Sequence, residues 1–135
     1  MYKLLIVDDE EMVRGGIRGY IDWERYGIEV AGEAEDGLEA LEMIERAPVH
    51  IVITDVKMPH MDGIALSQRL REKHENIKII FISGYDDLDY VKSALKLDAL
   101  DYILKPLQLK ELRAVVEKVV RILDEEDRQV RQRNE

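Results

Sequence analysis

Four apolar runs of this sequence each end in residues that could do chemistry. Asp8 and Asp9 follow one run, Asp55 follows another, and Ser83 and Lys105 follow two more. A short apolar run bounded by polar residues is typical of a strand buried on both faces, as in a parallel sheet. The carboxyl ends of such strands lie at one edge of the sheet, which is where open α/β sheets bind ligands. The sequence therefore predicts one site that contains all five side chains.

The chemistry of these side chains points to phosphoryl transfer. Three carboxylates held close together need a compensating cation, and hard oxygen ligands suit Mg²⁺. Lys105 would add a fixed positive charge and Ser83 a hydroxyl donor. This set could receive a phosphoryl group while the Asp55 carboxylate attacks phosphorus. A single Asp at a strand end is more commonly a helix cap, but capping does not account for four strand ends together.

Composition restricts the protein's class. The 135 residues, 46% hydrophobic and 36% charged, indicate one soluble domain with a modest extension. The formal net charge of −9 argues against direct DNA binding, and the absence of Cys excludes disulfides and thiolate catalysis. We find no apolar segment that could span a membrane, and the start is too short for a signal peptide, so we expect a cytoplasmic protein without membrane contact.

Strand and helix patterns alternate along the chain. The predicted strands are Lys3 to Val7, Glu29 to Ala34, Ile51 to Ile53, Ile77 to Ile82 and Asp101 to Leu104. A long connector from Tyr20 to Gly27, which contains Trp23, precedes the second strand. This alternation predicts an α/β protein with a parallel sheet.

Apolar residues at helical spacing predict the faces that pack on the sheet. The polar run from Arg71 to Asn76 is expected to close the third helix after Leu70, and Pro48 to end the second. The predicted apolar positions are Met12, Val13 and Ile17; Leu38, Leu41 and Ile44; Ile64 to Leu70; Val91, Ala94 and Leu95; and Leu109, Leu112, Val116, Val119 and Leu123.

Four motifs resemble those of the receiver domain of two-component response regulators. They are V-D-D-E from Val7, D-V-K-M-P-H-M-D-G from Asp55, S-G-Y from Ser83 and D-Y-I-L-K-P from Asp101. The resemblance covers Lys3 to about Leu123. It implies a flavodoxin-like, doubly wound, five-stranded parallel sheet of order 2-1-3-4-5 with five helices, the last one extended.

The resemblance also implies roles for the residues of the site. Asp55 would be the phosphoacceptor, charged by the phosphohistidine of a sensor histidine kinase. Mg²⁺ would be bound by Asp55, directly by Asp9, mainly through water by Asp8, and by the backbone carbonyl of Lys57. Ser83 would donate a hydrogen bond to the phosphoryl group, and Lys105 would pair with it.

A conformational switch is the next implication of the resemblance. Tyr102 occupies the switch aromatic position, and its ring would turn inward when Ser83 moves toward the phosphoryl group. The surface of helix four, strand five and helix five would respond, with homodimerisation as a possible consequence. A plain packing role for Tyr102 is the alternative. The Lys105–Pro106 peptide bond is expected to be cis.

The long connector and the S-G-Y-D-D-L-D-Y run resemble receivers attached to AraC-type helix-turn-helix domains. We expect residues 1–123 to form the receiver domain and residues 124–135 a helical linker toward an output domain absent from this chain. DNA contact would then occur only through that domain. The chain is expected to be either a piece of a longer protein or a stand-alone receiver.

Two other functions use the same residues. An aspartate-nucleophile phosphohydrolase would need a second Asp as general acid, but Lys57 stands at that position. A pure interaction module would be expected if a site residue were missing, and none is. We therefore expect no enzyme activity beyond self-phosphorylation and autodephosphorylation. We also expect Lys57, a long cation beside the site, to alter the lifetime of the phosphoryl group.

Overall fold

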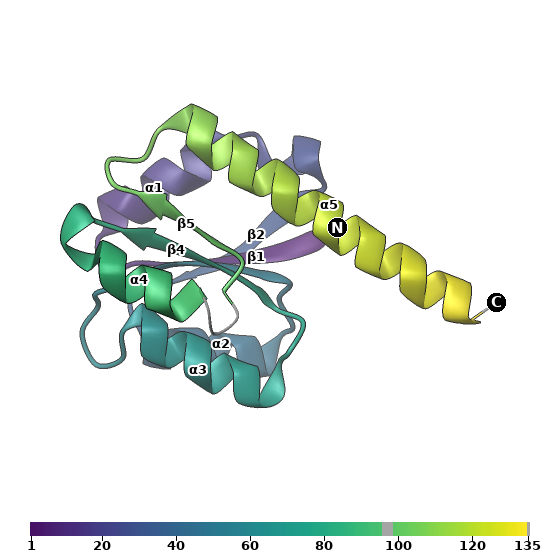
Figure 1. Cartoon of the computed structure of the whole chain (residues 1–135), viewed down its shortest axis with the longest axis horizontal. Coiled ribbons are helices and arrows are strands. Elements are labelled where there is room, and N and C mark those ends of the chain that lie inside the picture. Colours follow the sequence, from purple (N-terminus) through teal and green to yellow (C-terminus); the bar gives the residue numbers. More distant parts are fainter. Residues whose placement is uncertain (96–98, 135) are drawn as a thin grey trace.

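The structure, a computed structural model, describes residues 1–95 and 99–134 and alternates strands with helices (Figure 1). The strands are β1 (Tyr2–Val7), β2 (Ile28–Ala34), β3 (Ile51–Asp55), β4 (Lys78–Ser83) and β5 (Asp101–Leu104). The helices are α1 (Glu11–Tyr20), α2 (Gly37–Arg46), α3 (Gly63–Lys73), α4 (Leu88–Leu95) and α5 (Leu109–Asn134), with short 3-10 helices η1 (Trp23–Tyr26) and η2 (Tyr85–Asp87). Each predicted strand is present to within a few residues.

The five strands form one sheet of order β2-β1-β3-β4-β5, and every neighbouring pair is parallel. This is the doubly wound, flavodoxin-like order that the resemblance predicted. Because all the strands point the same way, their carboxyl ends meet at one edge of the sheet. Figure 1 shows the sheet between α1 and α5 on one side and α2, α3 and α4 on the other.

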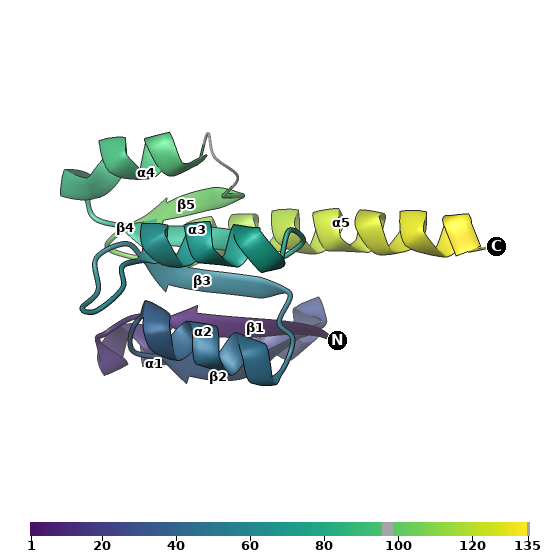
Figure 2. The same ribbon diagram turned by 90° about the horizontal axis from the view of Figure 1, so that it is seen from below.

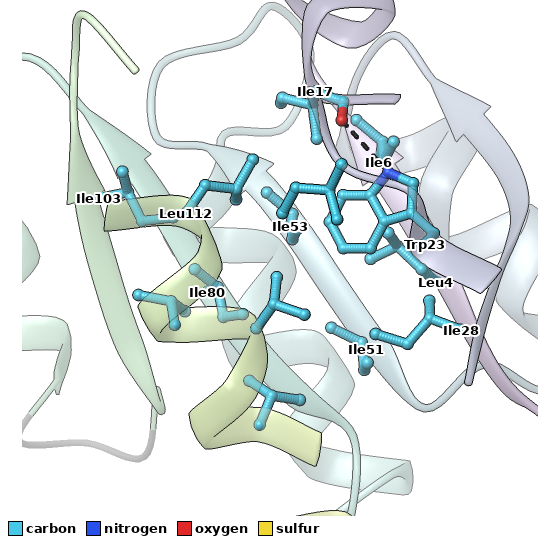
Figure 3. Close-up of a cluster of buried hydrophobic side chains, with 14 of the residues drawn as sticks. Leu4, Ile6, Ile17, Trp23, Ile28, Ile51, Ile53, Ile80, Ile103 and Leu112 are labelled. Atoms are coloured by element: carbon cyan, nitrogen blue, oxygen red, sulfur yellow. Dashed lines mark hydrogen bonds between the residues drawn. The ribbon is translucent and has the colours of Figure 1, made fainter. Parts of the chain in front are cut away.

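Alternate residues of each strand pack into two separate hydrophobic cores, one on each face of the sheet. On β1, Leu4 and Ile6 face the core under α1 and α5, whereas Leu5 and Val7 face the core under α2, α3 and α4. Successive side chains of a strand point to opposite faces, so a strand that is apolar throughout must be covered on both sides. Figure 3 shows the first of these cores, in which Ile53 and Ile80 lie under Leu112 of α5.

The long connector before β2 is a structured part of the first core. Trp23 is the first residue of η1 and is buried. Its indole nitrogen donates to the carbonyl oxygen of Ile17 at 3.2 Å (Figure 3) and to that of Arg18 at 3.1 Å. These bonds satisfy the polar atom of a large buried aromatic side chain. Gly27, with a φ of 75°, then ends η1 in the left-handed region that favours glycine.

Three apolar residues expected to pack on the sheet are exposed instead: Met12 (90%), Leu38 (49%) and Leu109 (40%). Spacings of five residues from Met12 to Ile17 and six from Leu38 to Ile44 do not return to the same helical face. The buried positions of α2 are Gly37, Ala40 and Ile44. Leu109 is the first residue of α5, so the turn that would cover it is missing.

Helix α3 is longer than the sequence predicted, because its polar end carries its own cap. The helix continues past Leu70 to Lys73, and the His74 backbone amide donates to the Leu70 carbonyl at 2.7 Å. The Arg71 guanidinium donates to the carbonyls of His74 at 3.2 Å and Glu75 at 3.1 Å. The polar run therefore satisfies the carbonyl end of the helix rather than breaking it early.

Helix α5 runs without a break through the predicted boundary after Leu123 and projects beyond the sheet (Figures 1 and 2). Its projecting part is tied to the amino-terminal edge of the sheet. The Tyr2 hydroxyl donates to the Asp124 carboxylate at 2.5 Å, and the Lys78 ammonium lies 2.6 Å from Glu126. Burial, together with the Asp124 carboxylate, raises the pKa of Tyr2 to about 12.

Among the described residues, no helix combines the length and the apolar character that crossing a membrane requires.

A close approach between α3 and β3 predicts that Gly63→Ala is strongly destabilising. A Cβ at position 63 would lie 2.2 Å from the Asp55 carbonyl oxygen, which is backbone and cannot rotate away. We expect a loss of about 1–3 kcal/mol or more in the free energy of unfolding. Gly19→Ala is the matched control, because nothing lies within 4 Å of a Cβ on that exposed helical residue. Urea unfolding followed by Trp23 fluorescence measures both, and equal stability of the two variants would contradict the packing described.

Candidate functional site

Asp55 lies at the end of the central strand β3, and the structure confines its carboxylate. The residue is 6% exposed and pairs in register with Ile82 of β4. Its Oδ1 accepts a hydrogen bond from the Val56 backbone amide at 2.9 Å. Burial raises the pKa of Asp55, and the Lys105 ammonium opposes that increase. The Asp55 carboxylate is thus held by one backbone hydrogen bond beside the Lys105 ammonium.

Lys105 provides that cation from the end of β5. Its Nζ lies 3.3 Å from Asp55 Oδ1 and 3.9 Å from Asp8 Oδ2. Its backbone amide donates to the Ser83 carbonyl at 2.8 Å, which continues the β4–β5 pairing into the loop. The Lys105–Pro106 peptide bond is cis, as the resemblance predicted.

Asp8 is fully buried at the end of β1. Its Oδ1 accepts from the Glu10 backbone amide at 2.8 Å, whereas its Oδ2 has no hydrogen-bond partner. Burial, and to a smaller extent the Asp55 charge, raises the pKa of Asp8 to about 6. A buried carboxylate with an unsatisfied oxygen is costly unless a cation completes it.

The carboxylates of Asp8, Asp9 and Glu10 are close enough to share a metal ion, since one oxygen of each lies within 4.8 Å of the others. Asp9 and Glu10 are exposed, so they present charge to solvent beside the buried Asp8. Carboxylate oxygens together with room for water are the ligands that Mg²⁺ prefers. The three carboxylates and the Asp8 oxygen that lacks a hydrogen bond therefore both fit Mg²⁺. Glu10 was not among the predicted ligands.

Ser83 is fully buried on β4, where it pairs in register with Leu104, the residue before Lys105. Its hydroxyl donates to the Gly84 carbonyl at 2.8 Å. Tyr102 is half-buried and packs against the core under α2, α3 and α4. The structure thus brings Ser83 beside the site and leaves the Tyr102 ring in ordinary packing contact.

The side chain of Lys57 lies at the surface of the site. Its side chain is 74% exposed, and its Nζ lies 2.9 Å from an Asp87 carboxylate oxygen. Hydrogen bonding and charge attraction from Asp87 raise the pKa of Lys57. This ion pair joins the loop after β3 to η2 after β4, at the same edge of the sheet as Asp55.

Sequence reasoning missed Asp87 and one buried cation, Arg14. The guanidinium of Arg14 donates to the Asp8 carbonyl oxygen at 2.6 Å. Its position between Val13 and Ile17, on the buried face of α1, could have indicated it, because a charged residue there requires a specific partner.

Comparison with known proteins gives a consistent family assignment. The sequence matches the response regulator receiver domain family over residues 4–117. The transcriptional regulatory protein YesN of Bacillus subtilis is 38% identical over 127 residues, which are 94% of this chain and 34% of that protein. The transcriptional regulatory protein HptR of Staphylococcus aureus is 36% identical over 129 residues, covering 96% of this chain and 50% of that protein. The chain thus spans about a third to a half of the length of these curated relatives.

Solved structures agree with the sequence relatives. The receiver domain of AraT, a response regulator from Geobacillus stearothermophilus, is 46% identical with a TM-score of 0.89, covering 93% of this chain and 98% of that one. The two-component transcriptional regulator AraC from Clostridium phytofermentans is 32% identical with a TM-score of 0.80, covering 90% and 94%. With its sheet order, its acidic edge and these matches, the chain belongs to the response regulator receiver domain family of two-component signalling systems.

Proposed function

We propose that this protein is a phosphorylation-activated switch in which Asp55 accepts a phosphoryl group from a sensor histidine kinase, in a Mg²⁺-dependent reaction. The observation that carries the proposal is the position of the Lys105 ammonium, 3.3 Å from Asp55 and 3.9 Å from Asp8. It places a fixed positive charge beside the nucleophile, where the negative charge of a phosphoryl group would arrive.

The transfer exchanges one bond to phosphorus for another. An Asp55 carboxylate oxygen attacks the phosphorus of a phosphohistidine, and the bond from phosphorus to the imidazole nitrogen breaks, leaving its electron pair on that nitrogen. Because the Val56 amide holds Oδ1, we assign the attack to Oδ2. Lys105 then pairs with the phosphoryl oxygens. Mg²⁺ bound by Asp8, Asp9, Asp55 and the Lys57 carbonyl would supply further positive charge to those oxygens.

We propose that Ser83 couples the presence of the phosphoryl group to a structural change at the protein surface. Its hydroxyl now donates to the Gly84 carbonyl, and it would exchange this partner for a charged phosphoryl oxygen, a stronger acceptor. Movement of Ser83 would open space for the half-buried Tyr102 ring. The surface of α4, β5 and α5 would then change, and it is our candidate for a phosphorylation-dependent homodimer interface.

The output is proposed to lie beyond α5. The relatives YesN and HptR are named transcriptional regulatory proteins and are longer than this chain. We assign residues 1–123 to the receiver domain and residues 124–135 to a helical linker toward an output domain, with DNA contact only through that domain. We also propose that the protein is cytoplasmic, as expected from the sequence.

The first prediction concerns the phosphoacceptor. Incubation with acetyl phosphate and Mg²⁺ should add one phosphoryl group per chain, detected by intact-protein mass spectrometry. The adduct should disappear in Asp55→Ala and when Mg²⁺ is chelated. Asp22→Asn, which removes an Asp that caps no helix with its side chain, should be labelled like the original protein. A folded protein that binds Mg²⁺ but accepts no phosphoryl group, even from a phosphorylated kinase domain, would instead be an interaction module.

The second prediction concerns the buried charge of Asp8. The pKa of Asp8 is raised in the folded state, so the protonated carboxyl is favoured by folding. The contribution of Asp8 to the free energy of unfolding is therefore complete below about pH 4 and is lost as the pH rises through about 6. The shift from 3.8 to about 6 corresponds to about 3 kcal/mol. Without metal, Asp8→Asn should therefore be more stable than the original protein by up to this amount at about pH 8, and the difference should shrink toward pH 4.

Urea unfolding in a chelating buffer measures this difference. The exposed Asp9 provides the control, since Asp9→Asn should change stability less. Added Mg²⁺ should stabilise the original protein at pH 8 by mass action and Asp8→Asn much less. The charge argument would be contradicted if the gain in stability of Asp8→Asn over the original protein were smaller at pH 8 than at pH 4.

The third prediction concerns the lifetime of the phosphoryl group. The Lys57–Asp87 ion pair joins two loops at the edge of the site, so its loss should give water easier access to phosphorus. Because an exposed ion pair contributes at most about 1 kcal/mol, Lys57→Ala should speed hydrolysis by no more than about fivefold. Asp87→Ala should act alike, and the double variant should add little. Lys73→Ala, which breaks an exposed pair with Glu45, is the control; unchanged hydrolysis in Lys57→Ala would reject the effect.

A further inference from the structure

Arg14 is a buried cation that the proposed reaction does not yet use. It is 8% exposed, and within the described part of the chain it is the one basic residue among the buried polar side chains. The others are Asp8, Thr54, Asp55 and Ser83. Burial of a guanidinium is costly unless partners compensate it, and an apolar side chain would pack there at lower cost. Its presence therefore calls for a specific role.

The partners of Arg14 connect α1 to the ends of β1 and β2. Its Nη1 donates to the backbone carbonyl oxygen of Asp8 at 2.6 Å, and its Nε lies 3.2 Å from Glu33 Oε1. The second oxygen of Glu33 pairs with Arg18. Glu33 thus offsets the charge of Arg14 and aims its guanidinium. Arg18 shares this carboxylate and is 55% exposed.

This contact completes the restraints on Asp8. The Asp8 amide donates to the Ala34 carbonyl at 3.0 Å, and Oδ1 accepts from the Glu10 amide at 2.8 Å. Arg14 holds the remaining backbone group, the carbonyl of the peptide that links Asp8 to Asp9. With the others engaged, the buried Oδ2 is the polar atom of Asp8 left without a hydrogen bond.

We infer that Arg14 is a positioning residue for the metal site: it fixes the Asp8–Asp9 peptide so that both carboxylates face one cation. This inference rests on the proposed function. A contact that orients a metal ligand contributes to metal affinity because the ligands need not be ordered when the ion binds.

The test is the affinity for Mg²⁺ alone, measured by isothermal titration calorimetry. Arg14→Gln should raise the Kd for Mg²⁺ roughly tenfold, the lower end of the effect of losing a contact behind a metal ligand. Arg14→Lys, which keeps the charge with a single-point donor, should fall between Arg14→Gln and the original protein. Arg18→Gln is the matched control: it removes the neighbouring cation from the same Glu33 but makes no contact with Asp8, so its Kd should stay within roughly twofold.

A second measurement separates positioning from a merely structural role. The Mg²⁺ concentration that gives half the maximal rate of acetyl phosphate labelling should rise in Arg14→Gln, while the rate at saturating Mg²⁺ returns toward the original value. A structural role would lower the urea midpoint and leave the Kd unchanged. An unchanged Kd in Arg14→Gln, or an equal increase in Arg18→Gln, overturns the inference.

The conservative variant keeps the test decisive if Arg14→Gln does not fold. In that case a Kd raised at least about threefold in Arg14→Lys supports positioning, and an unchanged Kd overturns it. Failure of the original protein to bind Mg²⁺ would overturn the metal site itself. Normal binding by the original protein and by both Arg14 variants would overturn this inference alone.

Discussion

The structure depends on negative charge that is held where water cannot fully solvate it. Asp8 is completely buried and Asp55 nearly so, and the Lys105 ammonium lies within ion-pair distance of both. Their strands are neighbours in a parallel sheet, so the backbones that carry the two carboxylates cannot separate without breaking the β1–β3 pairing. The site therefore has a standing demand for positive charge. The Lys105 ammonium supplies part of this positive charge, and a metal ion bound by the hard carboxylate oxygens would supply more.

The rest of the fold keeps this edge rigid. Strands that are apolar on both faces require helices on both sides, and the two cores supply them. On one side, Trp23 is buried in the core and its indole nitrogen donates hydrogen bonds to carbonyl oxygens near the end of α1. On the other, Gly63 lets the first turn of α3 approach the Asp55 carbonyl more closely than any side chain would allow. The positions of the side chains at the carboxyl edge of the sheet are therefore fixed by the packing of the two cores beneath them.

One helix connects the site to the opposite end of the domain. Helix α5 begins four residues after Lys105 and extends past the amino-terminal edge of the sheet, where Tyr2 and Lys78 anchor it at Asp124 and Glu126. Its direction is therefore set by contacts at the amino-terminal edge of the sheet, opposite the edge that carries Asp55. A change at the β5 end would reach a following domain through this single continuous element, which is the physical basis of the linker proposed for residues 124–135.

The strand order was predicted only through motifs that resemble those of a known family. The sequence by itself determined the residues at four strand ends, through apolar runs that stop at Asp8, Asp55, Ser83 and Lys105. These are local signals, because a buried strand must be apolar until it leaves the sheet. Tertiary structure alone decided that Arg14 holds the Asp8 carbonyl and that Lys57 pairs with Asp87. Each of these depends on helix rotation or on loops meeting across the sheet. Periodicity along one segment carries no information about which distant segment lies opposite it.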